Sequence, residues 1–307
     1  MLKHWIIGFF GAMLLLAGVA PAMAQQGQAA PARPKLGILE IKPTPALRAK
    51  VGQQRGGGSL SLDRVTQSMD GQLLDRLFQI RRYDLVARSD LETLLKEQDL
   101  QQAFAANPVE AFRMAGCDFG LIVTLDDFDD SEEQLRGEGG QVLAVRRTVR
   151  MSAVARIYDV QRGVLVATAN LQIGPMTDSQ RPQTGVGGGS GDQFGEMLVR
   201  MSREFASQAA IAVLDATLPA RVVSVRGSQV GINRGEGTGI EPGQEWIIYT
   251  GEGEPIIDPD TGEVLGVEEV AIGRVVIERV DERLAWGRAT EDFGIAVRAI
   301  ARRASPR

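Results

Sequence analysis

The sequence contains a single histidine, His4, and a single cysteine, Cys117. One cysteine cannot form a disulfide within the chain, whatever the redox state of its compartment. His4 lies in an N-terminal segment that we expect to be removed, so the mature chain lacks the imidazole that a Ser-His-Asp or Cys-His mechanism needs. It also lacks the ligand for a histidine-containing zinc site. We therefore expect a protein that is not an enzyme and carries no cofactor.

A basic run is also missing. The chain has 34 Lys and Arg against 39 Asp and Glu, which gives a net charge of −5. An acidic chain without a basic cluster is a poor candidate for nucleic-acid binding, and it lacks the polybasic patch that would hold it on an anionic bilayer. After residue 24, no apolar segment approaches the roughly 20 residues of a transmembrane helix. No pattern indicates a small-molecule substrate.

Residues 1–24 are typical of a secretory signal peptide. Lys3 provides a positive start, Trp5 to Val19 is apolar, and Ala22-Met23-Ala24 supplies a small-x-small cleavage site. An apolar stretch of about 15 residues is short for a permanent anchor, which is the alternative interpretation. We predict cleavage after Ala24 and a periplasmic location, with association with the outer membrane left open.

The segment 35–218, which follows a disordered tether at 25–34, has the pattern of an α/β domain. Val65, Met69, Leu73 and Leu77 recur at helical spacing, whereas 143–157 alternates between apolar and polar residues except at Arg147. Ser89 and Glu92 have the spacing of a helix capping box. The other expected strands are 36–41, 83–87, 119–125 and 164–173, and the other expected helices are 107–116 and 194–218. Residues 50–61 and 174–191 are expected to be a flexible loop and a linker.

Pro219 marks the predicted start of a second domain, 219–303, followed by a short charged tail at 304–307. Short strands separated by glycine-rich turns are expected over 221–226, 229–232, 245–249, 267–280 and 284–289. Strands of this length and spacing are typical of a small β-barrel or sandwich. The overall prediction is an α/β (α+β) chain.

Three segments of the first domain resemble the curli production assembly/transport (CsgG-type) family. Tyr83 to Gln98 resembles its strand-helix signature, Gly116 to Thr124 its next strand, and Ala155 to Gly163 its hairpin turn. The resemblance covers about 36–218. It implies an anticodon-binding-like α/β domain, a role in envelope export or assembly, envelope proteins as partners, and a homo-oligomeric ring.

The second domain resembles the C-terminal SH3-like domain of flagellar assembly (FlgT-type) proteins. The segments that carry this resemblance are Val230 to Gly235, Gly239 to Gln244 and Asp258 to Gly266. Two departures separate the chain from curli channels. No cysteine stands at the cleavage site to carry a lipid, and 126–141 and 175–191 lack the apolar face of a membrane hairpin.

The predicted function is a non-enzymatic periplasmic or outer-membrane-associated component of envelope assembly or secretion that acts through protein–protein interfaces. One alternative is a regulator of a cell-wall (penicillin-binding) enzyme, and another is a flagellar assembly accessory protein. An enzyme that uses a pair of carboxylates is the weakest interpretation, because no spacing favours any pair.

A dense acidic run could in principle chelate Ca²⁺. Adjacent carboxylates without a spaced ligand pattern are usually solvated, so we expect a loop at a strand end, balanced by Arg146, Arg147 and Arg150. The members of the run are Asp126, Asp127, Asp129, Asp130, Glu132 and Glu133.

Three other patterns have a structural explanation that we prefer. Asp258, Asp260 and Glu269 match three positions of a calcium loop, but Gly262 falls one position early, so a hairpin turn is expected. The glycines at 235, 237 and 239 and the run 185–191 are read as turns and a linker rather than phosphate cradles, since no Lys-Ser/Thr follows them. Cys117 is expected to be a buried small residue. We assign no catalytic, cofactor-binding or metal-binding residue.

Overall fold

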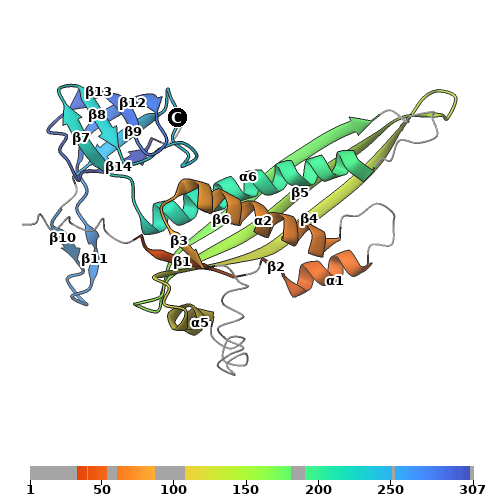
Figure 1. Ribbon diagram of the computed structural model, residues 1–307, viewed down its shortest axis with the longest axis horizontal. Helices are drawn as coiled ribbons and strands as arrows, with labels where there is room; N and C mark the ends of the chain where they lie inside the picture. The colour runs from red at the N-terminus through yellow and green to blue at the C-terminus, as the bar shows by residue number, and fades with distance from the viewer. Residues whose placement is uncertain are drawn as a thin grey trace, which may run out of the picture. The chain divides into compact units, whose positions relative to one another are not determined.

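The computed structural model describes residues 33–39, 41–53, 61–86, 108–180, 191–250 and 253–304. The expected signal peptide, most of the tether, the helix expected from Ser89 and the glycine run up to residue 190 lie outside these residues. Within them, no helix combines the length and apolarity needed to cross a membrane. The fold is mixed, with helices packed on curled sheets, so the predicted α+β class is confirmed (Figure 1).

The first sheet has the order β3-β1-β4-β5-β6, with β2 pairing with β4. β1 runs parallel to β3 and β4, whereas β4, β5 and β6 form long antiparallel hairpins. Its strands are β1 (Lys35–Ile38), β2 (Lys42–Pro43), β3 (Asp84–Val86), β4 (Phe119–Arg136), β5 (Val142–Asp159) and β6 (Val164–Gln180). The helices of this part are α1 (Pro45–Gln53), α2 (Leu62–Ile80), α5 (Pro108–Met114) and α6 (Gly191–Thr217).

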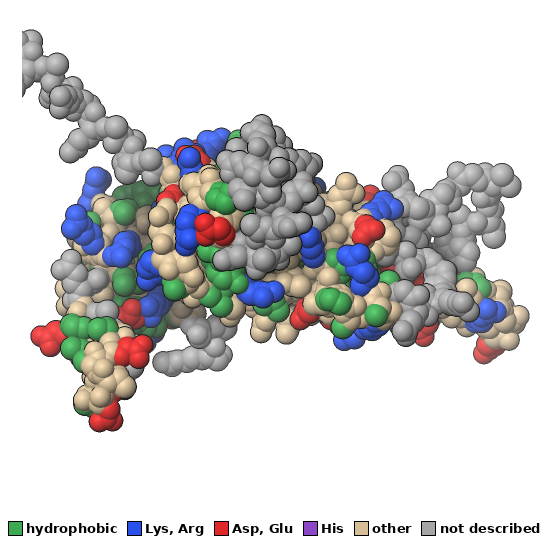
Figure 2. All heavy atoms as spheres, turned by 90° about the horizontal axis from the view of Figure 1, so that it is seen from below, with side chains coloured by type: hydrophobic (Ala, Val, Ile, Leu, Met, Phe, Trp, Pro, Cys, Tyr) green, Lys and Arg blue, Asp and Glu red, His purple; other side chains and the backbone are tan. Residues whose placement is uncertain are grey.

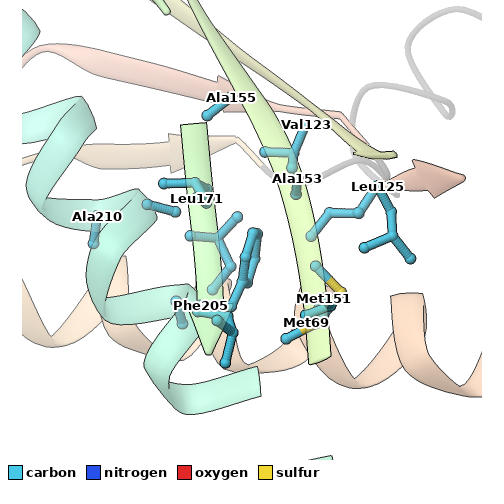
Figure 3. Packing of buried hydrophobic residues seen from close by; sticks show 14 of the residues in the cluster. Met69, Val123, Leu125, Met151, Ala153, Ala155, Leu171, Phe205 and Ala210 are labelled. Atoms are coloured by element: carbon cyan, nitrogen blue, oxygen red, sulfur yellow. The ribbon is translucent and has the colours of Figure 1, made fainter. Parts of the chain in front are cut away.

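Helices α2 and α6 lie side by side on one face of this sheet (Figure 1). Ser61 caps α2 by accepting a hydrogen bond from the Arg64 backbone N–H, and Arg81 ends the helix in a left-handed conformation. The predicted apolar stripe of α2 is fully buried against the sheet and α6. Figure 3 shows Met69, Phe205 and Leu171 from three elements packed into this core.

Helix α5 covers the opposite face of the sheet, beside β1 and β4 (Figure 1). The ring of Phe112 lies flat against two strands at glycines, because a Cβ at Gly120 would lie 2.2 Å from the ring and one at Gly37 would lie 2.4 Å from it. Cys117 and Val160 complete this small cluster.

The C-terminal strands form a closed sheet with the order β14-β9-β12-β13-β8-β7. A bridge between Arg221 and Ile300, with a hydrogen bond from the Ala301 N–H to the Ala220 carbonyl, joins the first strand to the last. The expected small β-barrel is therefore present, with its own hydrophobic cluster. Its SH3-like type and the domain limits at 219 and 303 stay predictions. Its strands are β7 (Val222–Arg226), β8 (Gln229–Ile232), β9 (Glu245–Tyr249), β12 (Ala271–Val280), β13 (Ala285–Asp292) and β14 (Ile300–Arg303).

Several predicted boundaries are wrong. Residues 50–53, expected in a loop, belong to α1, and residues 174–180, expected in a linker, continue β6 through Pro175. The strand expected over 267–280 is divided, because β11 (Val264–Val267) pairs with β10 (Pro255–Ile257) in a separate hairpin. The two strand errors concern segments that owe their structure to cross-strand pairing rather than to an apolar pattern, whereas residues 50–53 are the last turn of a helix.

Candidate functional site

The acidic run is part of strand β4 and not a loop. All of its residues except Asp126, which lies at a bulge, have a register partner on β5, and the register brings Asp129 against Arg150 and Glu133 against Arg146. The Arg150 Nε lies 3.2 Å from an Asp129 carboxylate oxygen, and the Arg146–Glu133 pair is longer, at 3.8 Å. The expected loop is wrong, but the expected balance by the arginines of the next strand is confirmed.

Among the described ion pairs between β4 and β5, only the pair of Asp130 and Arg147 is buried. Their side chains are only 6% and 4% exposed, and the Arg147 guanidinium donates to both carboxylate oxygens of Asp130. This bidentate contact gives each oxygen of the buried carboxylate a hydrogen-bond donor. Arg147 is the residue that interrupts the apolar alternation of its strand, so the sequence carried a signal for this pair. Among the described residues, no group of three or more Asp, Glu, Cys or His side chains is placed to hold a metal ion.

The second calcium-loop pattern is the turn between β10 and β11. The Asp258 carboxylate accepts hydrogen bonds from the backbone N–H groups of Thr261 and Asp260, which lower its pKa below the ordinary value. Gly262 follows with φ +71°, a conformation that favours glycine. Glu269 lies outside the turn and pairs with Arg302 at 2.5 Å. The hairpin-turn interpretation is confirmed.

The glycines at 235, 237 and 239 form the turn between β8 and β9, as expected. A Cβ at Gly235 would lie 2.3 Å from the backbone oxygen of Glu282, so this glycine permits a close backbone contact. The preceding residue, Arg234, was missed by sequence reasoning. Its side chain is fully buried, and its Nη2 donates to the Asp215 carboxylate at 2.8 Å. This ion pair ties the turn to α6.

Cys117 is fully buried beside Phe112 and Val160, which confirms the prediction of a small core residue. Burial raises the pKa of the thiol to about 11, because the thiolate would lose its hydration. The thiol is therefore protonated at neutral pH and has little nucleophilic character.

We expect the burial of Cys117 to make stability fall at alkaline pH. The thiol of the unfolded chain titrates near its ordinary pKa of 9.0, whereas the folded thiol holds its proton to about 11. The stabilising contribution is complete below the unfolded pKa and is lost as pH rises toward the folded one, with a maximum loss of about 2–3 kcal/mol at roughly 1.36 kcal/mol per pH unit. Chemical denaturation of wild type and Cys117→Ala between pH 8 and 11 measures this loss. Parallel pH profiles for the two proteins would contradict the prediction.

Strand β6 has an open edge. In the part of the chain that the structure describes, β5 is its only strand partner, so β6 is the terminal strand of the sheet. From Val164 to Ile173 it carries no charged residue and no proline. Val164 and Leu165 are exposed, and the Gln172 carbonyl accepts a long hydrogen bond, 3.4 Å, from the Gln208 side chain of α6. An uncharged terminal strand of this length is a template for pairing with another chain.

The outer surface between α2 and α6 is hollowed. Two adjoining grooves of about 740 and 530 Å³ share Arg200 and Arg203 in their walls. The larger one also takes in Arg64 from α2 and Leu198 and Val199 from α6. Arginines outnumber carboxylates on this surface, although Glu196 lines the larger groove and Asp75 and Glu204 line the smaller one.

Comparison with known proteins leaves the family open. No family model matches the chain, and no curated protein matches it. The solved structures that resemble it include the lipoprotein GNA1162 from Neisseria meningitidis, with 14% identity over 56% of this chain and 98% of that one and a TM-score of 0.32. Another is the LpoB C-terminal domain from Salmonella enterica, with 15% identity over 48% of this chain and 87% of that one and a TM-score of 0.27. A third is a PelC dodecamer from Paraburkholderia phytofirmans, with 10% identity over 58% of this chain and 94% of that one and a TM-score of 0.25. Likenesses of this size settle neither family nor function, and the curli-type and flagellar-type resemblances stay predictions.

Proposed function

We propose that the chain is an exported, non-enzymatic component of the bacterial cell envelope that works by binding other envelope proteins. The observation that carries this proposal is the open, uncharged edge of β6 between Val164 and Ile173. The signal-like N-terminus and the lack of a mature histidine support the compartment and the non-enzymatic role.

Binding would occur by strand addition. An extended segment of the partner pairs with the free backbone groups of β6, and these main-chain hydrogen bonds supply affinity that does not depend on sequence. Alternate side chains along the edge, with Leu165 and Thr168 exposed, then select the partner.

Within this class we favour a regulator of a cell-wall enzyme, such as a penicillin-binding enzyme, over a curli-type secretion channel. A channel hairpin needs strands of roughly 9–11 residues with a continuous apolar outer face. The extended ends of β4 and β5 carry charge on both faces, with Asp130 and Arg147 on one and Asp129 and Arg150 on the other. The second candidate is an envelope assembly or secretion component that forms a homo-oligomeric ring, and a flagellar assembly accessory protein is a further alternative.

The test is site-specific photo-crosslinking in living cells. With a crosslinker at Leu165 we expect a single major adduct with an envelope protein, identified by mass spectrometry, and we expect a processed chain in the periplasmic fraction. Thr168→Lys, which places a charge beside the open edge, should lower the adduct yield at least tenfold. A crosslinker at Val297, exposed on the barrel, is the matched control. An unprocessed cytosolic chain, or equal adducts from both positions, would overturn the proposal.

A further inference from the structure

The β10–β11 hairpin is a separate two-stranded sheet with an exposed apolar surface. It pairs with neither of the other sheets in the described residues. Ile256, Ile257 and Val264 are 51%, 55% and 58% exposed. An isolated two-stranded hairpin is at best marginally stable in water, so a surface that covers these side chains would stabilise it. Figure 2 shows hydrophobic and acidic side chains on this projecting hairpin at its lower left.

The charge of the hairpin has one sign. Residues 253–270 contain no lysine or arginine. Within the described ranges, its one ion-paired carboxylate is that of Glu269, which is bound to Arg302. The remaining carboxylates form no ion pair with the described part of the chain, and they are Glu254, Asp258, Asp260, Glu263 and Glu268. The hairpin is thus an apolar surface surrounded by free negative charge.

The grooves between α2 and α6 have the complementary chemistry. Arg64, Arg200 and Arg203 line the larger groove together with a single carboxylate, that of Glu196, and none of the three arginines forms an ion pair within the described ranges. The smaller groove is closer to neutral, because Arg76, Arg200 and Arg203 share its walls with Asp75 and Glu204. Leu198 and Val199 supply the apolar base. No residue of β10 or β11 is among the residues that line either groove.

We propose that the β10–β11 hairpin of one copy docks into the α2–α6 groove of a second copy. Guanidinium groups bind carboxylates through two parallel hydrogen bonds, and the exposed isoleucines and valine would lose their contact with water on the apolar base. Opposite charge on the two surfaces also steers the encounter and makes its rate depend on salt.

A contact between two different surfaces has a consequence for assembly. Each copy would offer one hairpin and one groove, so the contact is head-to-tail, and repeated contacts close into a ring or continue as a filament. The inference deepens the proposed function by naming a second copy as one of the partners. It uses residues distant in sequence from β6, so its failure and that of the proposed function can be told apart.

The test is native mass spectrometry and sedimentation velocity on the mature chain at low ionic strength. We expect concentration-dependent assemblies larger than a monomer for wild type. Reversing the groove charge with Arg200→Glu and Arg203→Glu, or the hairpin charge with Glu263→Lys and Glu268→Lys, should weaken association at least tenfold. Thermal melting followed by circular dichroism checks that each variant is folded.

Mixing the two double variants gives the decisive result. Each variant alone brings like charges together, so it should stay monomeric. In an equimolar mixture the charge-reversed hairpin meets the charge-reversed groove and the native hairpin meets the native groove, so the mixture should assemble as wild type does. The control variants reverse two exposed charges elsewhere, Arg48→Glu with Arg226→Glu, and should assemble as wild type does. A monomeric wild type at about 100 μM, within the range in which micromolar contacts form, would overturn the proposal. So would assembly that the charge reversals leave unchanged.

Discussion

Replacing Arg147 with alanine should lower the free energy of unfolding by about 3–5 kcal/mol. The change leaves the Asp130 carboxylate, only 6% exposed, without its two-pronged partner in the interior of the sheet. An uncompensated buried charge must be either protonated or hydrated, and both cost free energy. Urea denaturation followed by far-UV circular dichroism measures the effect.

Arg146→Ala is the matched control for this prediction. Arg146 is the preceding residue, but it points to the solvated face and pairs with Glu133 at 3.8 Å with both side chains largely exposed. Exposed pairs of this kind contribute about 0–1 kcal/mol. The double change Asp130→Leu with Arg147→Met should recover most of the loss, because it removes both charges together. Equal effects of the two single alanine changes would show that the buried pair has no special energetic role.

Phe205→Ala should destabilise the chain by about 3–5 kcal/mol. Phe205 lies on α6, is fully buried, and packs among Met69, Met151 and Leu171 between the helices and the sheet (Figure 3). Removing the ring leaves a cavity. The surrounding helices and strands cannot move in to fill this cavity, so its cost in stability remains.

The control for the Phe205 prediction is Phe78→Ala. Phe78 lies on α2 with 72% of its surface exposed, so its loss should change the free energy of unfolding by no more than about 0.5 kcal/mol. Guanidinium denaturation of both variants gives the comparison. A small effect of Phe205→Ala would mean that the α6–sheet core rearranges to fill the space.

The elements that the sequence predicted well are those whose pattern is local. The stripe of α2 and the strands β8 and β9 are set by spacing and by neighbouring turn residues. All four stripe residues lie in α2, and β8 and β9 have the predicted limits. The apolar alternation of β5 identified its buried face from Arg147 to Ile157, whereas Leu143, on the same predicted face, is exposed.

The elements that were missed depend on partners distant in the sequence. The end of β4 is rich in Asp and Glu, which disfavour strands in isolation, and it is extended only because β5 presents arginines opposite it. Residues 174–191 were predicted to be a linker, but the pairing of β6 with β5 continues on both sides of Pro175. The open edge of β6 and the grooves between α2 and α6 follow from strand order and helix packing, which no single segment encodes.

The closure of the barrel constrains the order in which the chain can fold. Ala220 and Arg221 pair with residues at 300 and 301, so β7 lacks a neighbour on one side until β14 arrives. In the exported chain that we propose, the N-terminus crosses the inner membrane first, and the sheet of β1 to β6 can fold while later residues are still in the translocation channel. If transport stalled after β13, the edges of β7 and β9 that β14 normally covers would stay unpaired in the periplasm. Chaperones and proteases would then compete for these edges.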